Sequence, residues 1–310
     1  MNSTASARSR SQAAMGISAH GADLDIAATV AWKDGIVTRL TGGVSGLLRK
    51  AKVRLVTGEA RLRDGKTAVV DTPEGPVMIH AEALVIATGS APVELPTLPF
   101  GGKVMSSTDA LSLHELPASL AVVGGGYIGL ELGIAFAKFG TKVTVIEAAP
   151  RILPQYDSDL TKPVSARLSA LGITVLTRAR AGGLGEDGAL RVAFDDAAED
   201  IAADRILVTV GRLPRSDAAG IPGLRLDMDG RFIRIDGPLS HLDARRLCHW
   251  RRDRRADAGP SRHGTGRNGG RDHRRSQPRL DKRAIPAVCF TDPENRQCRP
   301  VPRRGGHAGA

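Results

Sequence analysis

Cysteine is scarce in this sequence, and long apolar stretches are missing from it. Its three cysteines, Cys248, Cys289 and Cys298, are too few for a disulfide framework, so we expect a reducing compartment, the cytoplasm. No apolar run reaches the roughly 18–20 residues that a membrane-spanning helix needs, which excludes a spanning protein. The first residues contain Arg and Ser without an apolar core, which argues against a secretory signal.

The positive charge is confined to one end of the chain. Residues 241–310 contain 18 Lys and Arg against 7 Asp and Glu, a surplus that equals the +11 of the whole chain. The first 240 residues are therefore neutral overall. A neutral body and a basic tail need separate explanations.

The first third of the chain predicts a polar terminus, one helical region and several short strands. Residues 1–20 are small and polar and are expected to be disordered. The pattern from Asp23 to Lys50 is helical, with an interruption expected at Gly42 and Gly43. Strand-like runs follow at residues 53–56, 67–70, 77–79 and 83–87, with turn signals at Asp64-Gly65 and Pro73-Glu74-Gly75.

Residues 119–212 alternate between strand and helix patterns. Strands are predicted at residues 120–123, 142–146, 173–176, 190–194 and 205–210, and helices at residues 127–139 and 157–171. This alternation favours an α/β fold in which crossover helices connect a parallel sheet. The pattern disappears after about residue 240, and a strand-like run, AIPAVCF, returns at residues 284–290.

A glycine motif follows the first strand of that region. Gly124-Gly125-Gly126-Tyr127-Ile128-Gly129 has the spacing G-x-G-x-x-G, and it opens a predicted helix. In such a motif Gly124 would allow a tight turn, Gly126 the close approach of a pyrophosphate, and Gly129 the packing of the helix on the strand. The N–H groups and positive dipole end of the helix attract phosphates. The segment therefore predicts a Rossmann-like dinucleotide-binding domain.

Two acidic residues extend this site. Glu147 ends the second strand, 18 residues after Gly129, where a carboxylate would accept hydrogen bonds from the adenosine ribose and repel a 2′-phosphate, favouring NAD over NADP. Glu131 is either a contact to the nicotinamide or an ordinary solvated charge. The competing interpretation of the whole motif is a glycine-rich turn without a ligand, which the strand–turn–helix–strand context disfavours.

The histidines give no comparable signal. His20, His80 and His114 are isolated in the sequence, and we interpret them as surface or core residues. No metal site is predicted.

The order of these motifs resembles the pyridine nucleotide–disulfide oxidoreductases, and within that family the dihydrolipoamide dehydrogenases. The similar segments are residues 32–37 and 40–43 (the helix leading out of the family's flavin domain), Gly58-Glu59-Ala60 (its adenine-side turn), Ala87-Thr88-Gly89-Ser90 (the return to the FAD), Gly124–Gly133, residues 151–154, Val210-Gly211-Arg212, and residues 284–294 (the opening strand of its dimerisation domain).

The resemblance implies sites for two cofactors. The residues it assigns to NAD are Gly124, Gly125, Gly126, Tyr127, Ile128, Gly129, Glu131, Glu147, Ala179 and Gly211. Those it assigns to FAD are Ala60, Thr88, Gly89 and Ser90. Members of the family oxidise a protein-bound dihydrolipoyl group through a cysteine pair and FAD, pass a hydride to NAD, and form homodimers.

Three features of the family pattern are not found in this sequence. No flavin fingerprint precedes Trp32, and no two cysteines have the spacing Cys-x-x-x-x-Cys. The sequence also ends before the His–Glu base pair, in which the histidine deprotonates the dithiol. We therefore predict no catalytic residues in this chain, weak or absent FAD binding, no lipoamide turnover, and retained NAD(H) binding.

The basic tail allows two interpretations. Clusters such as Arg251, Arg252, Arg254 and Arg255 suit a nucleic-acid-binding arm, but the stretch has one aromatic residue, interspersed acids and no groove-reading motif. Alternatively, codons permitted for residues 248–253, shifted by one base, encode Ala-Ile-Gly-Asp-Val, which resembles the family's second flavin motif. The same shift converts the following residues into an amphipathic helix, so we favour an out-of-frame origin and consider nucleic acid an unlikely partner.

These observations divide the chain into five predicted regions. They are a disordered terminus (1–20), a partial FAD-binding domain (21–118), an NAD-binding domain (119–240), an out-of-frame basic segment (241–283) and a remnant of a dimerisation domain (284–310). We interpret the chain as a truncated, frame-disrupted copy reduced to NAD(H) binding. A lipoyl-bearing protein of a 2-oxo acid dehydrogenase complex and a homodimer are expected of an intact version alone. The alternatives are an NAD(H)-binding protein without redox chemistry and a nucleic-acid-binding protein.

Overall fold

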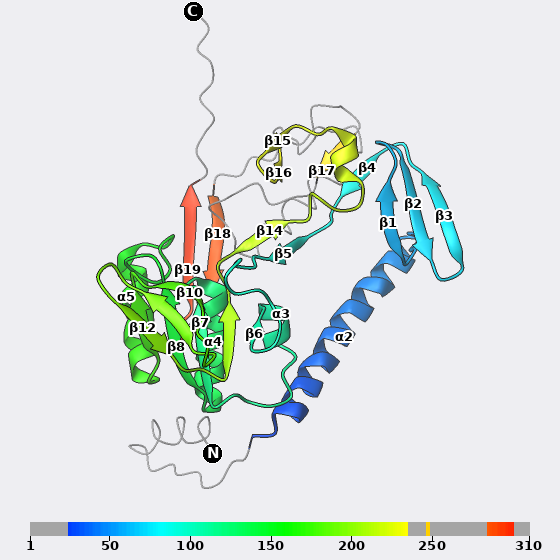
Figure 1. Ribbon diagram of the computed structural model, residues 1–310. Helices are drawn as coiled ribbons and strands as arrows, with labels where there is room; N and C mark the ends of the chain where they lie inside the picture. Colours follow the sequence, from blue (N-terminus) through cyan, green and yellow to red (C-terminus); the bar gives the residue numbers. More distant parts are fainter. Residues whose placement is uncertain (1–23, 235–245, 249–283, 301–310) are drawn as a thin grey trace, which may run out of the picture. The chain divides into compact units, whose positions relative to one another are not determined.

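The computed structural model describes residues 24–234, 246–248 and 284–300 (Figure 1). These form two compact units. Unit 1 contains residues 24–54, 92–212 and 290–295, and unit 2 contains residues 55–91, 213–234, 246–248, 284–289 and 296–300. The terminus predicted to be disordered and the basic segment, apart from residues 246–248, lie outside the described residues. The five predicted region boundaries stay predictions.

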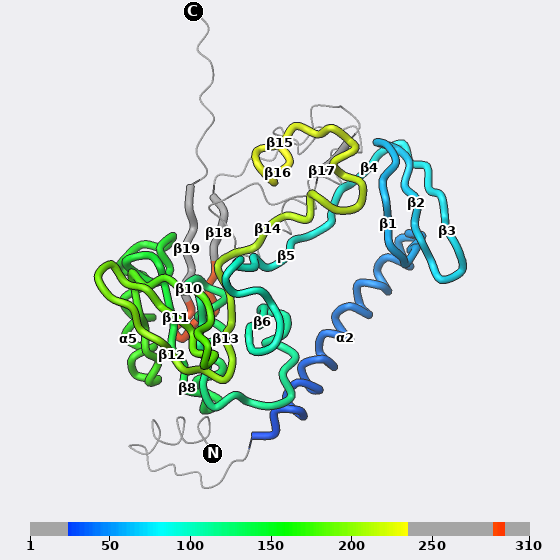
Figure 2. The backbone as a smooth tube through the Cα atoms, in the orientation of Figure 1, coloured from blue at the N-terminus to red at the C-terminus, as the bar shows by residue number. Residues whose placement is uncertain are grey.

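Unit 1 is built on a parallel five-stranded sheet. Its strand order is β6-β13-β7-β8-β9, and every neighbouring pair in it is parallel. The strands are β6 (Val104–Met105), β7 (Ser119–Val123), β8 (Lys142–Glu147), β9 (Thr174–Thr177) and β13 (Arg205–Val208). Helices α4 (Tyr127–Phe139) and α5 (Ser158–Ala170) make the first two crossovers, and their course is green in Figure 2. The predicted α/β fold with a parallel sheet and crossover helices is confirmed.

Local sequence explains why these elements form where they do. Strand β7 is apolar and buried from Leu120 to Val123, as a central parallel strand must be. Helix α4 ends at Gly140, whose φ of 108° is the left-handed conformation that glycine adopts at helix ends. Asp157 caps α5 by accepting a hydrogen bond from the Asp159 N–H. The core of the sheet comprises Leu98, Val104, Ala121, Val123, Ile146, Ala179, Leu190, Val192, Ile206 and Val208.

One predicted strand belongs to a different sheet. The run at residues 190–194 forms β11 (Leu190–Ala193), which lies between β10 (Arg180–Leu184) and β12 (Ala198–Ile201) in an antiparallel three-stranded sheet. Its assignment to the parallel sheet was wrong. The buried side chains of Leu190 and Val192 still reach the core of the parallel sheet, which is why the run is apolar.

Helix α2 (Ile26–Lys50) corrects two further predictions. It runs through Gly42 and Gly43 without a break, because each glycine costs about 1 kcal/mol relative to alanine and does not remove a backbone hydrogen bond. The strand predicted at residues 53–56 is not formed. The Val53 N–H donates to the Leu48 carbonyl at 3.0 Å as part of the helix end, where the Ala51 and Lys52 N–H groups also bond back to the last turn. A short helix, α3 (Ser107–Ala110), has a capping box made by Ser106 and Asp109.

Unit 2 contains small sheets and a separate core. An antiparallel sheet is formed by β1 (Glu59–Leu62), β2 (Thr67–Thr72) and β3 (Gly75–His80), and β4 (Leu84–Ile86) pairs in parallel with β17 (Arg246–Cys248). The strands predicted at 67–70, 77–79 and 83–87 are thus confirmed. The other elements are η2 (Ile221–Leu224), β15 (Met228–Asp229), β16 (Phe232–Ile233), β18 (Ala284–Cys289) and β19 (Asn295–Pro300). The core comprises Ile86, Ile221, Leu224, Leu226 and Ile233.

The chain passes between the two units after Arg54, within β5 (Ser90–Pro92), within β14 (Arg212–Pro214), and at both ends of the segment Phe290–Asn295. Within the described ranges, no helix is long and apolar enough to cross a membrane.

Candidate functional site

The glycine turn lies directly after β7. Gly124 has a φ of +108°, and its N–H donates to the Ile146 carbonyl at 2.8 Å. A Cβ at this position would lie 2.8 Å from the Thr209 carbonyl oxygen and is excluded by backbone, not by a side chain that could move. The turn therefore requires glycine both for its conformation and for its contact with the chain after β13.

Gly129 holds α4 against the turn. A Cβ there would lie 2.2 Å from the Gly124 carbonyl oxygen, 2.6 Å from Thr209 Oγ1 and 2.9 Å from Val122 Cγ1. At Gly126 nothing lies within 4 Å of the Cβ position, and this residue caps α4 without a side-chain hydrogen bond. The Cβ position of Gly126 at the positive end of α4 is thus unobstructed, and Tyr127 and Ile128 are half-exposed in the first turn. These features fit a dinucleotide pyrophosphate.

Glu147 connects the end of β8 to the glycine turn. Its Oε2 accepts the Gly125 N–H at 2.7 Å, and its Oε1 accepts the Ala149 N–H at 2.7 Å. The side chain is half-buried. Each carboxylate oxygen has two lone pairs, so one on each remains for the two hydroxyls of a ribose. The carboxylate is fixed in place before any ligand arrives, which fits the predicted adenosine-ribose contact.

The strand order of the parallel sheet has its switch point beside β7. The chain runs from β7 to β8 and β9 on one side and returns as β13 on the other, so the order reverses between β7 and β13, where open α/β sheets bind ligands. Ala179, 1% exposed, donates its N–H to the Glu147 carbonyl on the β8 side. Gly211, with a φ of +136°, follows β13, and its carbonyl accepts the Val93 N–H.

Thr209 is a residue of this site that sequence reasoning missed. It is 8% exposed, and its hydroxyl lies 3.1 Å from the Val123 carbonyl and 3.2 Å from the Gly124 carbonyl. It therefore joins the end of β13 to the glycine turn. No local motif marks it, because the contact joins residues 85 and 86 positions apart.

Glu131 has a backbone partner from a distant part of the chain. It is half-buried, and its Oε1 accepts the Phe290 N–H at 2.8 Å. Burial raises the pKa of Glu131, and the hydrogen bond from Phe290 offsets part of that effect. A half-buried carboxyl with a raised pKa beside a nucleotide-type turn is a candidate functional group.

Glu131→Gln should change how stability depends on pH. The folded-state pKa of Glu131 is raised above 4.5. Between the pKa of the unfolded chain and that of the folded protein, the folded protein holds a proton that the unfolded chain has lost, so stability falls as the pH rises through this range. The glutamine cannot ionise and its carbonyl can still accept the Phe290 N–H. Urea unfolding at several pH values should show the variant equal to the wild type in acid and more stable at neutral pH. A constant difference between the two proteins across the range contradicts this expectation.

The residues that the resemblance assigns to FAD lie on strands and loops of unit 2. Ala60 lies exposed in β1, paired with Val70. Thr88 donates its hydroxyl to the Arg215 carbonyl at 3.1 Å, and the carbonyl of Gly89 accepts the Arg215 N–H, while Ser90 begins β5. The described elements of unit 2 are strands and one 3-10 helix, so this part of the chain offers a flavin diphosphate no α-helix N-terminus. As described, these residues do not fit a complete FAD site.

The described cysteine and histidine side chains lie on separate elements. Cys289 is buried at the end of β18, and the backbone of Cys248 lies in β17. His80 Nδ1 lies 3.2 Å from Thr67 Oγ1 across two strands, and His114 is exposed. His20 lies outside the described part of the chain. No cluster of metal-ligating side chains is found in that part.

Known proteins share this sequence pattern and fold. A family model described as pyridine nucleotide-disulphide oxidoreductase matches residues 4–241. The dihydrolipoyl dehydrogenase of Pseudomonas aeruginosa is 46% identical over 303 residues, covering 92% of this chain and 61% of the relative. That of Geobacillus stearothermophilus is 42% identical over 226 residues, covering 72% of this chain and 48% of the relative. The chain thus spans about half to three-fifths of the length of these relatives.

A solved structure shows the same fold at lower identity. The Cu(II) complex of an HOCl-induced flavoprotein disulfide reductase from Escherichia coli superposes with a TM-score of 0.75 at 24% identity, covering 88% of this chain and 63% of that one. The family match extends over most of the sequence. The glycine turn, Glu147 and the strand order agree with it. The chain belongs to the pyridine nucleotide-disulphide oxidoreductase family.

Proposed function

We propose that this chain binds NAD(H) as the nucleotide-binding part of a dihydrolipoyl dehydrogenase, and that it does not by itself oxidise a dihydrolipoyl group. The observation that carries the proposal is the packing at Gly129, where the helix N-terminus, the glycine turn and Thr209 leave no room for a Cβ. This packing holds the N-terminus of α4 at the glycine turn, where the open Gly126 position lets a pyrophosphate approach the backbone. The fixed carboxylate of Glu147 supports NAD over NADP, because it would repel a 2′-phosphate.

The residues divide the work of binding along the dinucleotide. The first turn of α4 would hold the pyrophosphate at the open Gly126 position, and Glu147 would accept hydrogen bonds from the adenosine ribose. Glu131 and Gly211 would orient the nicotinamide end. When bound, NAD+ supplies a hydride acceptor, and the protein supplies its position.

The redox chemistry of the named relatives needs groups that this chain does not contain in the required pattern. Cys248, Cys289 and Cys298 are separated by 41 and 9 positions, so none forms the Cys-x-x-x-x-Cys pair expected from the family resemblance. The described flavin-side residues also lack the helix that would bind a diphosphate. A lipoyl-bearing protein and a homodimeric partner are therefore proposed for an intact version. We also propose a cytoplasmic location, because three cysteines suit a reducing compartment.

The test is a set of three measurements on the purified full chain. Calorimetric titration with NADH should give one site per chain with weaker binding of NADPH, and dihydrolipoamide-dependent reduction of NAD+ should equal that of a protein-free control. Flavin absorbance after purification should be absent or well below one equivalent. A chain that purifies with one equivalent of flavin and turns over dihydrolipoamide contradicts the proposal, as does one that binds no NADH.

A further inference from the structure

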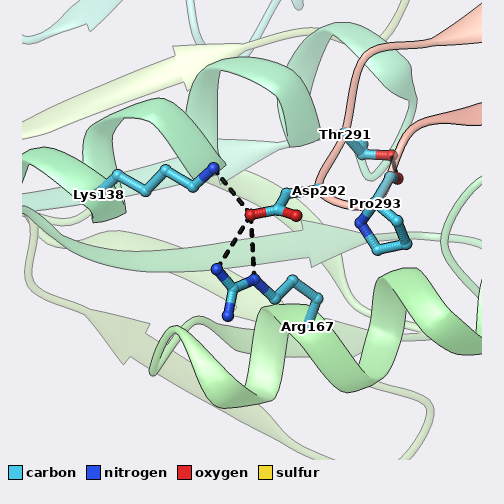
Figure 3. Close-up of polar contacts among 5 residues, drawn as sticks. All are labelled: Lys138, Arg167, Thr291, Asp292 and Pro293. Carbon is cyan, nitrogen blue, oxygen red and sulfur yellow. Dashed lines mark hydrogen bonds and ion pairs between the residues drawn. The ribbon is translucent and has the colours of Figure 1, made fainter. Parts of the chain in front are cut away.

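Residues 290–294 pack on helices α4 and α5 of unit 1, although more than 100 positions of the chain separate them from these helices. Thr291 is 4% exposed, and its hydroxyl donates to the Pro293 carbonyl at 2.8 Å, which closes a local turn (Figure 3). We call residues Phe290–Glu294 the returning segment. Its Phe290 and Asp292 contact helices α4 and α5 of the same unit.

The first contact is made by Asp292 with two cations from different helices. Its Oδ2 lies 2.8 Å from Nζ of Lys138 in α4, and 3.1 and 3.0 Å from Nε and Nη2 of Arg167 in α5 (Figure 3). The hydrogen bond from Lys138 is the largest cause of a lowered pKa at Asp292, and the one from Arg167 adds to it. One carboxylate oxygen thus joins the returning segment to both crossover helices.

The second contact is made with α4, the helix that also carries Lys138. The Phe290 N–H donates to Glu131 Oε1 at 2.8 Å. Glu131 and Lys138 are seven positions apart in α4, so they lie on one face of the helix, two turns apart. Phe290 and Asp292 are two positions apart in the returning segment and contact that face at these two points.

We propose that Asp292 is a positioning residue for the nucleotide site, which holds the returning segment so that the Phe290 N–H fixes the Glu131 carboxyl at the nicotinamide end. This inference rests on the proposed NAD(H) binding. Without the carboxylate at position 292, this segment would lose its bonds to Lys138 in α4 and Arg167 in α5 and would keep the bond from the Phe290 N–H to Glu131. The segment would then leave Glu131 for part of the time, and the carboxyl would lose its fixed orientation.

The experiment compares two ligands that share one end. NADH and ADP-ribose both carry the adenosine ribose and pyrophosphate, and only NADH carries a nicotinamide. Asp292→Asn should weaken NADH binding at least about fivefold, the scale of losing a partly buried ion pair of about 1 kcal/mol, and change ADP-ribose binding less than about twofold. The Phe290 amide should exchange faster with deuterium. Asp292→Glu should restore part of both effects.

A matched control variant is Asp159→Asn. Asp159 forms an exposed ion pair with Lys162 in α5 at 2.8 Å, so its loss removes the same charge without touching the returning segment. It should leave both ligands and the Phe290 exchange unchanged. Equal weakening of NADH and ADP-ribose by Asp292→Asn would overturn the positioning role, since general destabilisation affects both. Unchanged exchange at Phe290 in Asp292→Asn would overturn it as well.

The two proposals fail in different ways. If the wild-type chain bound ADP-ribose but Asp292→Asn bound NADH with normal affinity, the function would stand and the inference would be wrong. If the wild type bound neither ligand, the proposed function would be wrong and the positioning role would fall with it. Phe290 exchange would then still report whether Asp292 holds the segment, which separates the two results.

Discussion

Gly129→Ala is expected to abolish measurable NADH binding and to lower the free energy of unfolding by about 3 kcal/mol. The added Cβ would lie 2.2 Å from the Gly124 carbonyl oxygen and 2.6 Å from Thr209 Oγ1. Neither the turn nor the end of β13 can yield without breaking the hydrogen bonds that hold them, so α4 must move away from β7. Its N-terminus would then no longer reach the pyrophosphate.

The matched control lies one turn further along the same helix. At Gly133 an added Cβ meets Val143 Cγ1 at 3.5 Å and Val122 Cγ2 at 3.7 Å, which is ordinary contact. Gly133→Ala should therefore retain NADH binding and gain about 0.5–1 kcal/mol of stability from the reduced entropy of the unfolded chain. Calorimetric titration and urea unfolding measure both quantities. If Gly129→Ala bound NADH with an affinity similar to that of Gly133→Ala, the glycine turn would not be the nucleotide site.

Much of unit 1 could be predicted from the sequence because its signals are local. The turn, the helix N-terminus and Glu147 all lie between Val123 and Glu147, so their spacing alone indicated how they would meet. Helix α4 was predicted with its observed bounds, Tyr127–Phe139. A residue whose role depends on strand order could not be found in this way, and Thr209 is the example: its contact exists because β13 lies beside β7.

The errors have physical causes of two kinds. The apolar pattern of Leu190–Ala193 identified a strand but could not identify its partners, because β10 is glycine-rich and β12 is mostly acidic or small, and both give weak strand signals. Gly42 and Gly43 suggested a helix break, but a propensity cost without a lost hydrogen bond leaves a long helix intact. The contact of Asp292 with Arg167 joins residues 125 positions apart and gives no local signal.

Glu147→Ala is the second substitution with a large expected effect. Alanine would leave the N–H groups of Gly125 and Ala149 without the two oxygens that each now accept one of them at 2.7 Å. Hydrogen bonds to a charged group contribute about 1.5–3 kcal/mol each, less at a half-exposed site. We expect the variant to lose about 2 kcal/mol of stability and to bind NADH at least about tenfold more weakly.

The same substitution should change the choice between the two dinucleotides. With the carboxylate removed, no negative charge at this position repels a 2′-phosphate, so NADPH should lose less affinity than NADH. The ratio of NADH affinity to NADPH affinity should fall at least about tenfold. Glu186→Ala is a suitable control, because Glu186 is an exposed acid in the turn between β10 and β11 and its loss removes one negative charge away from the site. That control should leave the ratio unchanged. If Glu147→Ala kept the wild-type ratio while losing stability, Glu147 would hold the glycine turn without contacting the ribose, and the preference for NAD would have to come from another residue.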